Sequence, residues 1–368
     1  MLESTTSKKI NKGNAMKKKL TYMLAVTSDY VFAAGNIVLG LIRHRPQKDF
    51  DVAIFYDEMC DADKKIFEST GICHLHQYTC PEKFEKAIRT RCPKFNDENF
   101  AKHFSFLKFA KFEIFTLLEQ YENAVWLDAD MAIQDDTSSI IDYGPFAITI
   151  DKDWTVQNNF TAPIPNYDMK KDGVCSAVFL VSDALPRYKE MRQWCYDMAE
   201  ECSPYFKNID QGIFNLLLQH FDIKFKFLPL YEWQCITGRN EATEARIVHF
   251  GTRQKVWSSP EILSAFPEWF RIHKKWLSLG GSDFTRPSGW KEFSAYEVFR
   301  QKNEKIKKLE QERDHYKNVS LNRTASYRCP DYKVCLFGLP IWKKKSKGSR
   351  DKYYLFGFIH LITVKHKD

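Results

Sequence analysis

The sequence contains no run of 18 apolar residues, although 44% of its 368 residues are hydrophobic and 15% are aromatic. Because a helix needs about 20 mostly apolar residues to span a bilayer, we expect no transmembrane helix. Residues 1–19 are rich in lysine but lack the apolar segment that a secretory signal requires. We therefore expect a cytoplasmic protein with one α/β domain of about 250 residues plus appendages.

The ten cysteines form no C-x-x-C pair and no compact framework, which is typical of a reducing compartment. Cys73-His74-Leu75-His76 and Cys80 carry the thiolate and imidazole groups that bind zinc. The segment alternates like a β-strand, however, and no second pair of ligands stands at zinc-finger spacing. We therefore favour a structural strand over a zinc site.

The middle of the chain has no excess of positive charge. The formal net charge is +8, of which residues 1–20 carry +5, residues 331–368 carry +6 and the part between them −3. A basic segment can meet nucleic acid, anionic lipid or only water. Because the charge is confined to the two ends, we disfavour a nucleic-acid-binding protein.

Segments of strand type and helix type alternate through the central part of the chain. Residues 21–26 and 51–56 predict β-strands, whereas residues 31–43 and 61–69 predict helices. This alternation predicts an α/β fold with a mostly parallel central sheet that helices flank. Further strands are expected at 124–127, 146–151, 174–181, 225–228 and 246–250, and further helices at 100–120, 184–201 and from 210 onward.

The chain is expected to have four parts: a flexible basic leader (1–19), the main domain (20–275), a helical extension (276–325) and a basic aromatic tail (326–368). The tail repeats the letters Leu-Phe-Gly nineteen residues apart, with a lysine cluster between the two copies. Two short aromatic β segments with lysines between them could contact an anionic membrane surface. The alternative is a hairpin that packs on the protein itself.

The stretch from Val125 to Ile133 contains two carboxylates directly after an apolar strand. One residue apart, Asp128 and Asp130 can both present oxygen ligands to one divalent cation. A polar turn is the alternative for any isolated D-x-D. Asp61-Ala62-Asp63 has the same spacing, but it precedes a helical pattern and is interpreted as the acidic first turn of a helix.

Other polar residues follow the predicted strands and can converge on the same edge of the sheet. Thr27 to Asp29, Asp151 and His249 all stand at such positions. Lys111 precedes the acidic strand, and Lys255 follows His249. Two acids and an imidazole can hold a metal ion while the two lysines contact phosphate oxygens, so the set predicts a site for a metal-bound diphosphate.

With these motifs in this order, residues 21–258 resemble the family 8 glycosyltransferases. The resemblance rests on Leu24 to Asp29 with Gly35 through Gly40, Lys111, Leu127-Asp128-Ala129-Asp130, Asp210-Gln211-Gly212, and His249-Phe250 with Lys255 and Trp257. It implies a GT-A nucleotide-diphospho-sugar transferase fold for residues 20–275, Mn2+ or Mg2+ as cofactor, a UDP-sugar donor and retention at the anomeric carbon.

The resemblance also implies a role for each matching residue. Asp128, Asp130 and His249 correspond to metal ligands. Thr27 and Asp29 fall where uridine binds, Lys111 and Lys255 match contacts to the donor sugar and diphosphate, and Ala129 and Asp151 belong to the nucleotide-sugar site. Asp210 and Gln211 match the catalytic positions: either one supports the sugar transiently from the opposite face, or the acceptor attacks on the face that UDP leaves. We favour the second route.

Two departures from the family pattern bear on the function. Cys175-Ser176-Ala177 stands where the family usually has Asn, a small residue and Gly, and Thr252 stands where a glycine is usual. The tail resembles those of bacterial surface-polysaccharide transferases. The sequence thus predicts hexose transfer to a glycan or lipid-linked acceptor, in lipopolysaccharide or other surface-polysaccharide synthesis, at the inner face of the cytoplasmic membrane. The alternative is a catalytically silent adaptor with the same fold.

Overall fold

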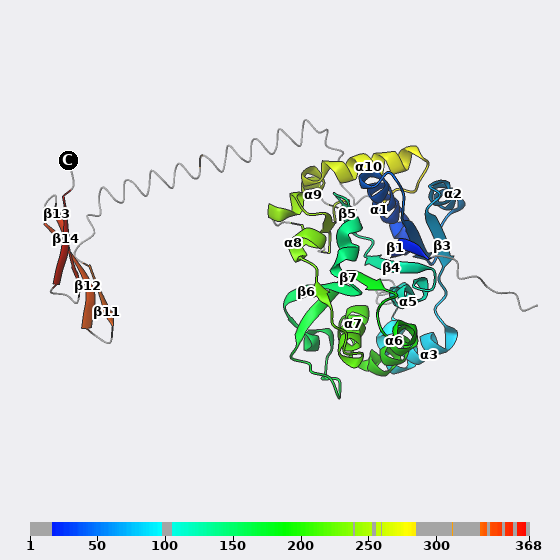
Figure 1. The fold of residues 1–368 in the computed structure, drawn as a ribbon, viewed down its shortest axis with the longest axis horizontal. Coiled ribbons are helices and arrows are strands. Elements are labelled where there is room, and N and C mark those ends of the chain that lie inside the picture. The colour runs from blue at the N-terminus through cyan, green and yellow to red at the C-terminus, as the bar shows by residue number, and fades with distance from the viewer. Residues whose placement is uncertain are drawn as a thin grey trace, which may run out of the picture. The chain divides into compact units, whose positions relative to one another are not determined.

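The first of two units in the chain, residues 1–291, is built on a seven-stranded sheet with the order β3-β2-β1-β4-β7-β6-β8 (Figure 1). Strand β7 runs antiparallel to its neighbours β4 and β6, and the other pairings in this sheet are parallel. The strands are β1 (Lys18–Val26), β2 (Asp51–Tyr56), β3 (Cys73–Gln77), β4 (Tyr121–Leu127), β6 (Phe146–Thr155), β7 (Asp172–Ser182) and β8 (Lys226–Phe227).

The computed structural model describes residues 17–97, 105–237, 240–251, 255–258, 260–284 and 311, together with 332–336, 339–347, 350–355 and 359–365. Most of the leader expected at 1–19 lies outside the described residues, as does most of the helical extension expected at 276–325. None of the helices within the described ranges is long and apolar enough to cross a membrane.

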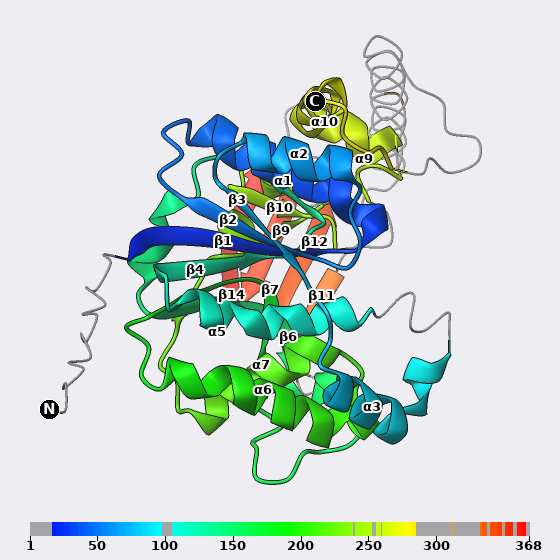
Figure 2. The same ribbon diagram turned by 90° about the vertical axis from the view of Figure 1, so that its right-hand side faces the viewer.

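Helices cover both faces of the seven-stranded sheet (Figure 2). One face packs against α1 (Val31–His44) and α2 (Asp61–Ser69), and α10 (Pro267–Ser278) packs on α1. The other face packs against α3 (Glu82–Arg91), α5 (Ile114–Leu117), α6 (Tyr188–Cys202) and α7 (Ile209–His220). The predicted α/β fold, with a mostly parallel central sheet flanked by helices, is therefore confirmed.

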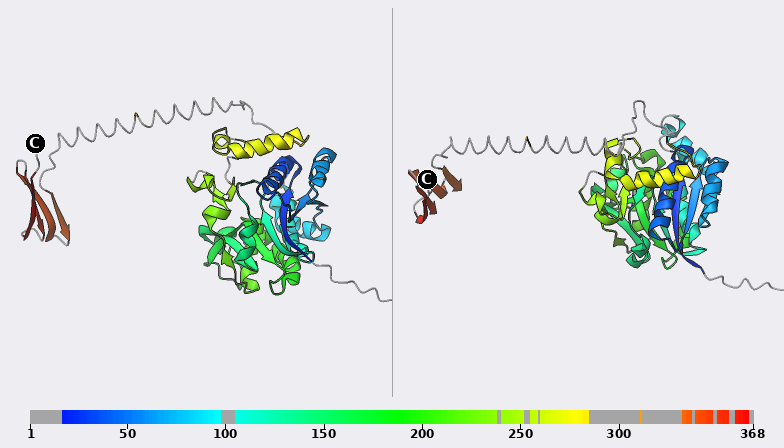
Figure 3. Two further views of the ribbon diagram at one scale, coloured as in Figure 1. Left: turned by 45° about the horizontal axis from the view of Figure 1, so that its top comes forward. Right: turned by 90° about the horizontal axis from the view of Figure 1, so that it is seen from above.

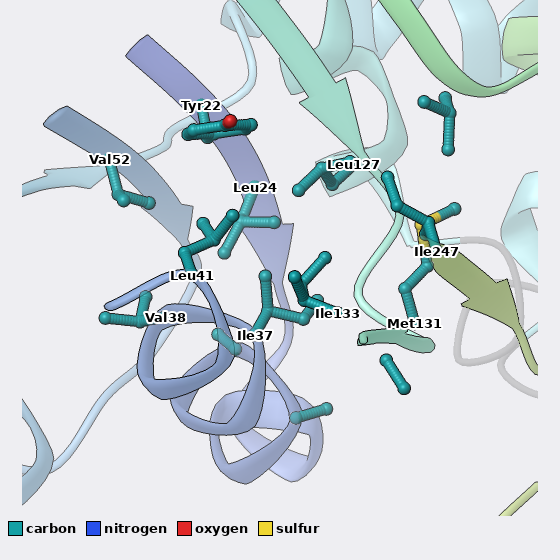
Figure 4. Packing of buried hydrophobic residues seen from close by; sticks show 14 of the residues in the cluster. Tyr22, Leu24, Ile37, Val38, Leu41, Val52, Leu127, Met131, Ile133 and Ile247 are labelled. Carbon is teal, nitrogen blue, oxygen red and sulfur yellow. The ribbon is translucent and has the colours of Figure 1, made fainter. Parts of the chain in front are cut away.

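Helix α1 is buried along much of its length because its sequence is apolar at nearly every position. Ile37, Val38 and Leu41 point toward Leu24 of β1 and Val52 of β2 (Figure 4). All five side chains are at most 2% exposed. Burying an aliphatic side chain of this size contributes about 1.5–3 kcal/mol, so this contact fixes the helix against the carboxyl-terminal half of β1.

Helix α10 lies beside α1 in both views of Figure 3. The two helices approach closely because Gly35 of α1 has no side chain, and the indole ring of Trp276 covers it. A Cβ atom at position 35 would come within 2.4 Å of that ring. Beyond α10, the backbone N–H of Ser282 donates to Asp63 at 2.8 Å, so α10 and the segment after it close over α1 and α2.

The second D-x-D of the sequence thus has a structural position. Helix α2 begins at Asp61, as the sequence predicted, and both Asp61 and Asp63 lie in its first turn. Asp63 is buried and accepts the Ser282 N–H described above, whereas Asp61 is 90% exposed in its side chain. The same spacing of two acids therefore belongs to the first turn of a helix here, and Asp63 serves packing.

The segment before β4 differs from the α-helix expected at 100–120. Residues Phe106–Glu113 form a 3-10 helix, followed by the short α5, and residues 98–104 lie outside the described part. With three residues per turn, side chains at i and i+3 lie above each other. This geometry stacks Lys108 over Lys111, and both reach the carboxyl-terminal edge of the sheet.

Several smaller boundaries also differ from expectation. The helix expected at 184–201 begins only at Tyr188, and the strand expected at 225–228 is limited to Lys226–Phe227. Asp210 lies in the first turn of α7, and Asn208 is the N-cap residue. The segment at 73–77 is the predicted strand, and among the described residues its Cys and His side chains do not form a metal-type cluster.

The second unit, residues 292–368, contains a four-stranded antiparallel sheet in the order β11-β12-β13-β14. The strands are β11 (Tyr332–Leu336), β12 (Leu339–Lys347), β13 (Arg350–Leu355) and β14 (Ile359–Lys365). Each Leu-Phe-Gly copy begins at the last residue of one strand and leads into the next strand. The sequence repeat therefore corresponds to two successive hairpins, and the lysine cluster lies within β12 rather than between two strands.

We predict that Gly35→Ala destabilises the protein. Alanine favours a helix over glycine by about 1 kcal/mol, but overpacking a buried site costs about 1–3 kcal/mol. The Trp276 ring is 1% exposed and has little room to move, so overpacking should dominate and lower the free energy of unfolding in urea by about 1–2 kcal/mol. In a Trp276→Leu background the same substitution should cost less. Equal costs in both backgrounds would contradict the predicted contact.

Candidate functional site

A cavity of about 660 Å³ opens at the carboxyl-terminal edge of β1 and β4. In parallel α/β sheets this edge is where loops from several strands meet. Its lining includes both acidic side chains of the Asp128-Ala129-Asp130 motif and both predicted lysines. The lining residues are Ala25, Val26, Thr27, Asp29, Tyr30, Ser105, Leu107, Lys108, Lys111, Trp126, Asp128, Ala129, Asp130, Asp210 and Lys255.

A small second sheet brings His249 to the acidic motif. It consists of β5 (Met131–Ile133), β9 (Cys235–Ile236) and β10 (Ile247–His249), in the order β5-β10-β9. His249 is paired with Met131 in the antiparallel β5–β10 ladder, and the N–H of Phe250 donates to the carbonyl of Asp130 at 2.8 Å. One potential ligand atom each from Asp128, Asp130 and His249 lies within 4.8 Å of the others.

Asp130 is surrounded by positive groups. Its Oδ1 lies 3.2 Å from Nε2 of His249, and its Oδ2 accepts from Nζ of Lys255 at 2.5 Å. Burial alone would raise the pKa of Asp130, but His249 and Lys255 outweigh burial and hold that pKa well below its usual range. Burial likewise opposes protonation of His249, yet the nearby Asp130 raises the pKa of the imidazole.

Asp128 is in a different environment from Asp130. A third of its side chain (33%) is exposed to the cavity, and Nζ of Lys111 lies 3.4 Å from its Oδ1. Burial by the surrounding protein raises the pKa of Asp128, and Lys111 and His249 offset only part of this effect. The Nε1–H of Trp126 donates to the same Oδ1 at 2.6 Å.

Lys111 connects the acidic motif to α7. Its side chain is 3% exposed and forms an ion pair with Asp210, while Nζ also donates to the carbonyl of Ser176 at 3.0 Å and to its Oγ at 3.2 Å. Burial would lower the pKa of Lys111, but the charges of Asp128 and Asp210 raise it. The ammonium group therefore stays charged although it is buried.

The other predicted residues fall into three groups. Thr27, Asp29 and Ala129 line the cavity, and the Thr27 hydroxyl donates to Asp29 at 2.5 Å. Gln211 lies next to Asp210 but outside the lining, with its amide donating to Asn159 at 3.3 Å. Asp151 is a residue of β6, and its side chain lies outside the described part of the structure.

Sequence reasoning omitted Tyr30, Ser105, Lys108 and Trp126 from the site. Each of them lines the cavity. Two of the four carried a usable signal: Trp126 precedes Asp128 by two residues and so shares its strand face, and Lys108 precedes Lys111 by three. Tyr30 is adjacent to Asp29, a predicted site residue, and Ser105 has no distinguishing pattern around it.

A family model described as "Glycosyl transferase family 8" matches residues 22–261. The chain belongs to this family. No curated protein matches the sequence. The apo structure of the WbbM bifunctional glycosyltransferase is 14% identical, with a TM-score of 0.50 over 72% of this chain and 52% of WbbM. The chain thus spans about half the length of WbbM.

The galactosyltransferase LgtC, solved with donor and acceptor sugar analogs, is 11% identical, with a TM-score of 0.50 over 70% of this chain and 99% of LgtC. At such identities the likeness shows the fold, and the predicted GT-A fold is confirmed. The predicted membership of family 8 is confirmed as well, so this is a glycosyltransferase-family protein.

The first departure from the family pattern lies directly beside Lys111. The hydroxyl of Ser176 is buried and lies beside the Lys111–Asp210 ion pair, 3.2 Å from Nζ of the lysine and 3.4 Å from Oδ2 of the carboxylate. The thiol of Cys175 instead accepts from the amide of Gln234 at 2.9 Å. At the position of the usual amide the chain therefore has the thiol of Cys175. Ser176 stands at the small-residue position, and its hydroxyl contacts both partners of the Lys111–Asp210 ion pair.

The second departure is Thr252, which stands where a glycine is usual and lies outside the described residues. The chain instead has a glycine one position earlier, at Gly251. Gly251 passes directly over the imidazole ring: a Cβ at this position would lie 2.7 Å from Cε1 and 3.0 Å from Nε2 of His249. A glycine two residues after the histidine is thus required for the ring to keep its position beside Asp130.

The residues of the cluster suit a divalent cation. Carboxylate oxygens are preferred by Mg2+ and Mn2+, and an imidazole nitrogen shifts the preference toward a first-row transition ion. Asp128, Asp130 and His249 together provide this mixed set within one ion's reach.

We predict that Gly251→Ala weakens binding of Mn2+ about tenfold, which is the usual effect of disturbing a group that orients a metal ligand. The added methyl group must push the His249 ring away from Asp130. Isothermal titration of Mn2+ into the protein measures this effect. Thermal unfolding should change little, and His249→Ala gives the reference for complete loss of the ligand. Unchanged Mn2+ affinity in Gly251→Ala would contradict the close contact.

Proposed function

We propose that this protein is an active, metal-dependent, retaining glycosyltransferase that moves a hexose from a UDP-sugar to a glycan acceptor. The observation that carries the proposal is the meeting of Asp128, Asp130 and His249 on a cavity that Lys111 and Lys255 also line. Family 8 membership supports the same conclusion. The LgtC structure, solved with donor and acceptor sugar analogs, supports a nucleotide-sugar donor and a sugar acceptor.

Asp128, Asp130 and His249 would hold Mn2+ or Mg2+. When bound, such an ion supplies positive charge to the diphosphate and so stabilises UDP as the leaving group. Lys255 lies against Asp130 and can add a second positive charge to the phosphate oxygens. Thr27, Asp29 and Tyr30 form the part of the cavity at the end of β1, and we assign them to uridine.

Asp210 and Lys111 would face the donor sugar. Burial would raise the pKa of Asp210, but Lys111 and Lys108 lower it, so the carboxylate is ionised. Its negative charge can stabilise the positive charge that develops on the sugar. Because Asp210 is ion-paired with Lys111, it is a weak nucleophile. We therefore favour attack of the acceptor on the face that UDP leaves, with Asp210 and Gln211 as stabilising groups and Asp151 near the donor sugar.

The proposal for the acceptor rests on the positive charge of residues 331–368. Residues 331–368 carry a net charge of +6, and the four strands of the second unit belong to this segment. We propose that the segment contacts an anionic membrane and brings the enzyme to a lipid-linked or growing surface glycan, such as lipopolysaccharide, on the inner face of the cytoplasmic membrane.

The central test is Asp130→Asn, which keeps the shape of the side chain but removes its charge. We expect release of UDP from UDP-sugars in the presence of Mn2+ to fall by at least about a hundredfold, because Asn binds the cation more weakly and the positive charge that stabilises the leaving diphosphate is lost. Asp61→Asn is the matched control, since it alters the other D-x-D at a 90% exposed position and should leave turnover unchanged.

The same assay distinguishes an active enzyme from a silent adaptor. A panel of UDP-sugars with Mn2+ and with chelator would show metal-dependent release of UDP by the active enzyme. No release with any donor would support the adaptor, for which the replacement of the usual amide by Cys175 is the motivating observation. Undiminished turnover in Asp130→Asn would overturn the assignment of the metal site.

Membrane contact has a separate test. We expect the full chain to sediment with vesicles that contain phosphatidylglycerol and to be released by salt, because a charge of +6 attracts anionic headgroups. A chain truncated after residue 330 should remain in the supernatant. Equal sedimentation of both chains would contradict the assignment of the second unit.

A further inference from the structure

Trp126 lines the cavity and contacts both Asp128 and Lys111. It is 3% exposed, lies on β4 two residues before Asp128, and its ring stacks on Phe179 at 6.5 Å between centroids. Side chains two residues apart on a strand point to the same face, so Trp126 and Asp128 project together from the end of β4.

The edge and the face of the indole have different partners. At the edge, Nε1–H donates to Oδ1 of Asp128 at 2.6 Å. At the face, Nζ of Lys111 lies 4.8 Å from the ring centroid, within the range of a cation–π contact. Lys111 also lies 3.4 Å from the same Oδ1. The indole N–H and the ammonium group thus both contact Oδ1 of Asp128.

We propose that Trp126 is a positioning residue for the metal site: its N–H holds Oδ1 of Asp128 and leaves Oδ2 of that carboxylate for a divalent cation. This inference rests on the proposed metal-dependent function and adds to it a group outside the three ligands. A hydrogen bond from an outer group orients a ligand, and its loss usually weakens metal binding by about 10–100-fold.

The indole ring and its N–H can be separated experimentally. Trp126→Phe keeps an aromatic face for Lys111 and Phe179 but removes the donor to Asp128. Replacement of Trp126 by 3-benzothienylalanine keeps the shape of the indole and substitutes sulfur for the N–H. The second variant therefore tests the hydrogen bond even if the cavity left by phenylalanine disturbs folding.

Trp233 provides a matched control in the same protein. It is fully buried, its Nε1–H donates to the hydroxyl of Tyr143 at 3.3 Å, and the guanidinium of Arg246 lies 5.7 Å from its ring. Trp233→Phe thus removes a buried indole N–H that also has a cation over its ring, but at a position that does not contact Asp128.

Isothermal titration with Mn2+ alone should show binding at least tenfold weaker in both Trp126 variants and unchanged in Trp233→Phe. Turnover of a UDP-sugar by the Trp126 variants should recover when Mn2+ is raised in proportion, which a general loss of folded structure would not allow. Native-like Mn2+ affinity in the benzothienyl variant would overturn the role of Trp126 while leaving the proposed function intact. Absence of Mn2+ binding by the unaltered protein would overturn both.

Discussion

The arrangement of the cavity depends on how the protein stabilises one buried positive charge, the ammonium group of Lys111. Lys111 is 3% exposed, and transfer of an unpaired ammonium group into the protein would cost several kcal/mol. Asp210, Asp128, the carbonyl and hydroxyl of Ser176 and the face of Trp126 all compensate it. These groups come from β4, β7 and α7 and from the turn after β4. Because the same groups form the walls of the cavity, stabilising the lysine also fixes the distance between the acidic motif and Asp210.

Much of this arrangement follows from sequence rules about strand ends. The alternation of strands and helices predicted the sheet, and the polar residues after β1 and β4 were expected at one edge of it. His249 was expected at the same edge, but it comes from β10 in the small second sheet. The two D-x-D copies were distinguished by the residues next to them, because a short apolar strand succeeds Asp130 whereas a helix begins at Asp61. The neighbouring residues were sufficient to tell the two copies apart because each copy borders a strand or a helix.

The remaining features depend on contacts that a single sequence does not record. The N–H of Trp126 reaches Asp128 because Phe179 of a neighbouring strand fixes the plane of the indole. The 3-10 form of Phe106–Glu113 accompanies the burial of Lys111, whereas residue periodicity alone favoured an α-helix. In the second unit, the period of nineteen residues was correct but each copy was assigned one strand, because the short connection inside each copy resembles a continuous apolar run.

The pairing of β5 with β10 has a consequence for how the molecule assembles. It joins Asp130 to Phe250 and so closes a chain segment of roughly 120 residues that contains β6, β7, α6 and α7. The site therefore depends on contacts between residues far apart in the sequence, and contacts of this kind slow folding. An ion that binds across this closure would stabilise the folded chain by about 2.7 kcal/mol at a hundred times its dissociation constant. Metal availability would then influence how much of the newly made protein reaches its native state.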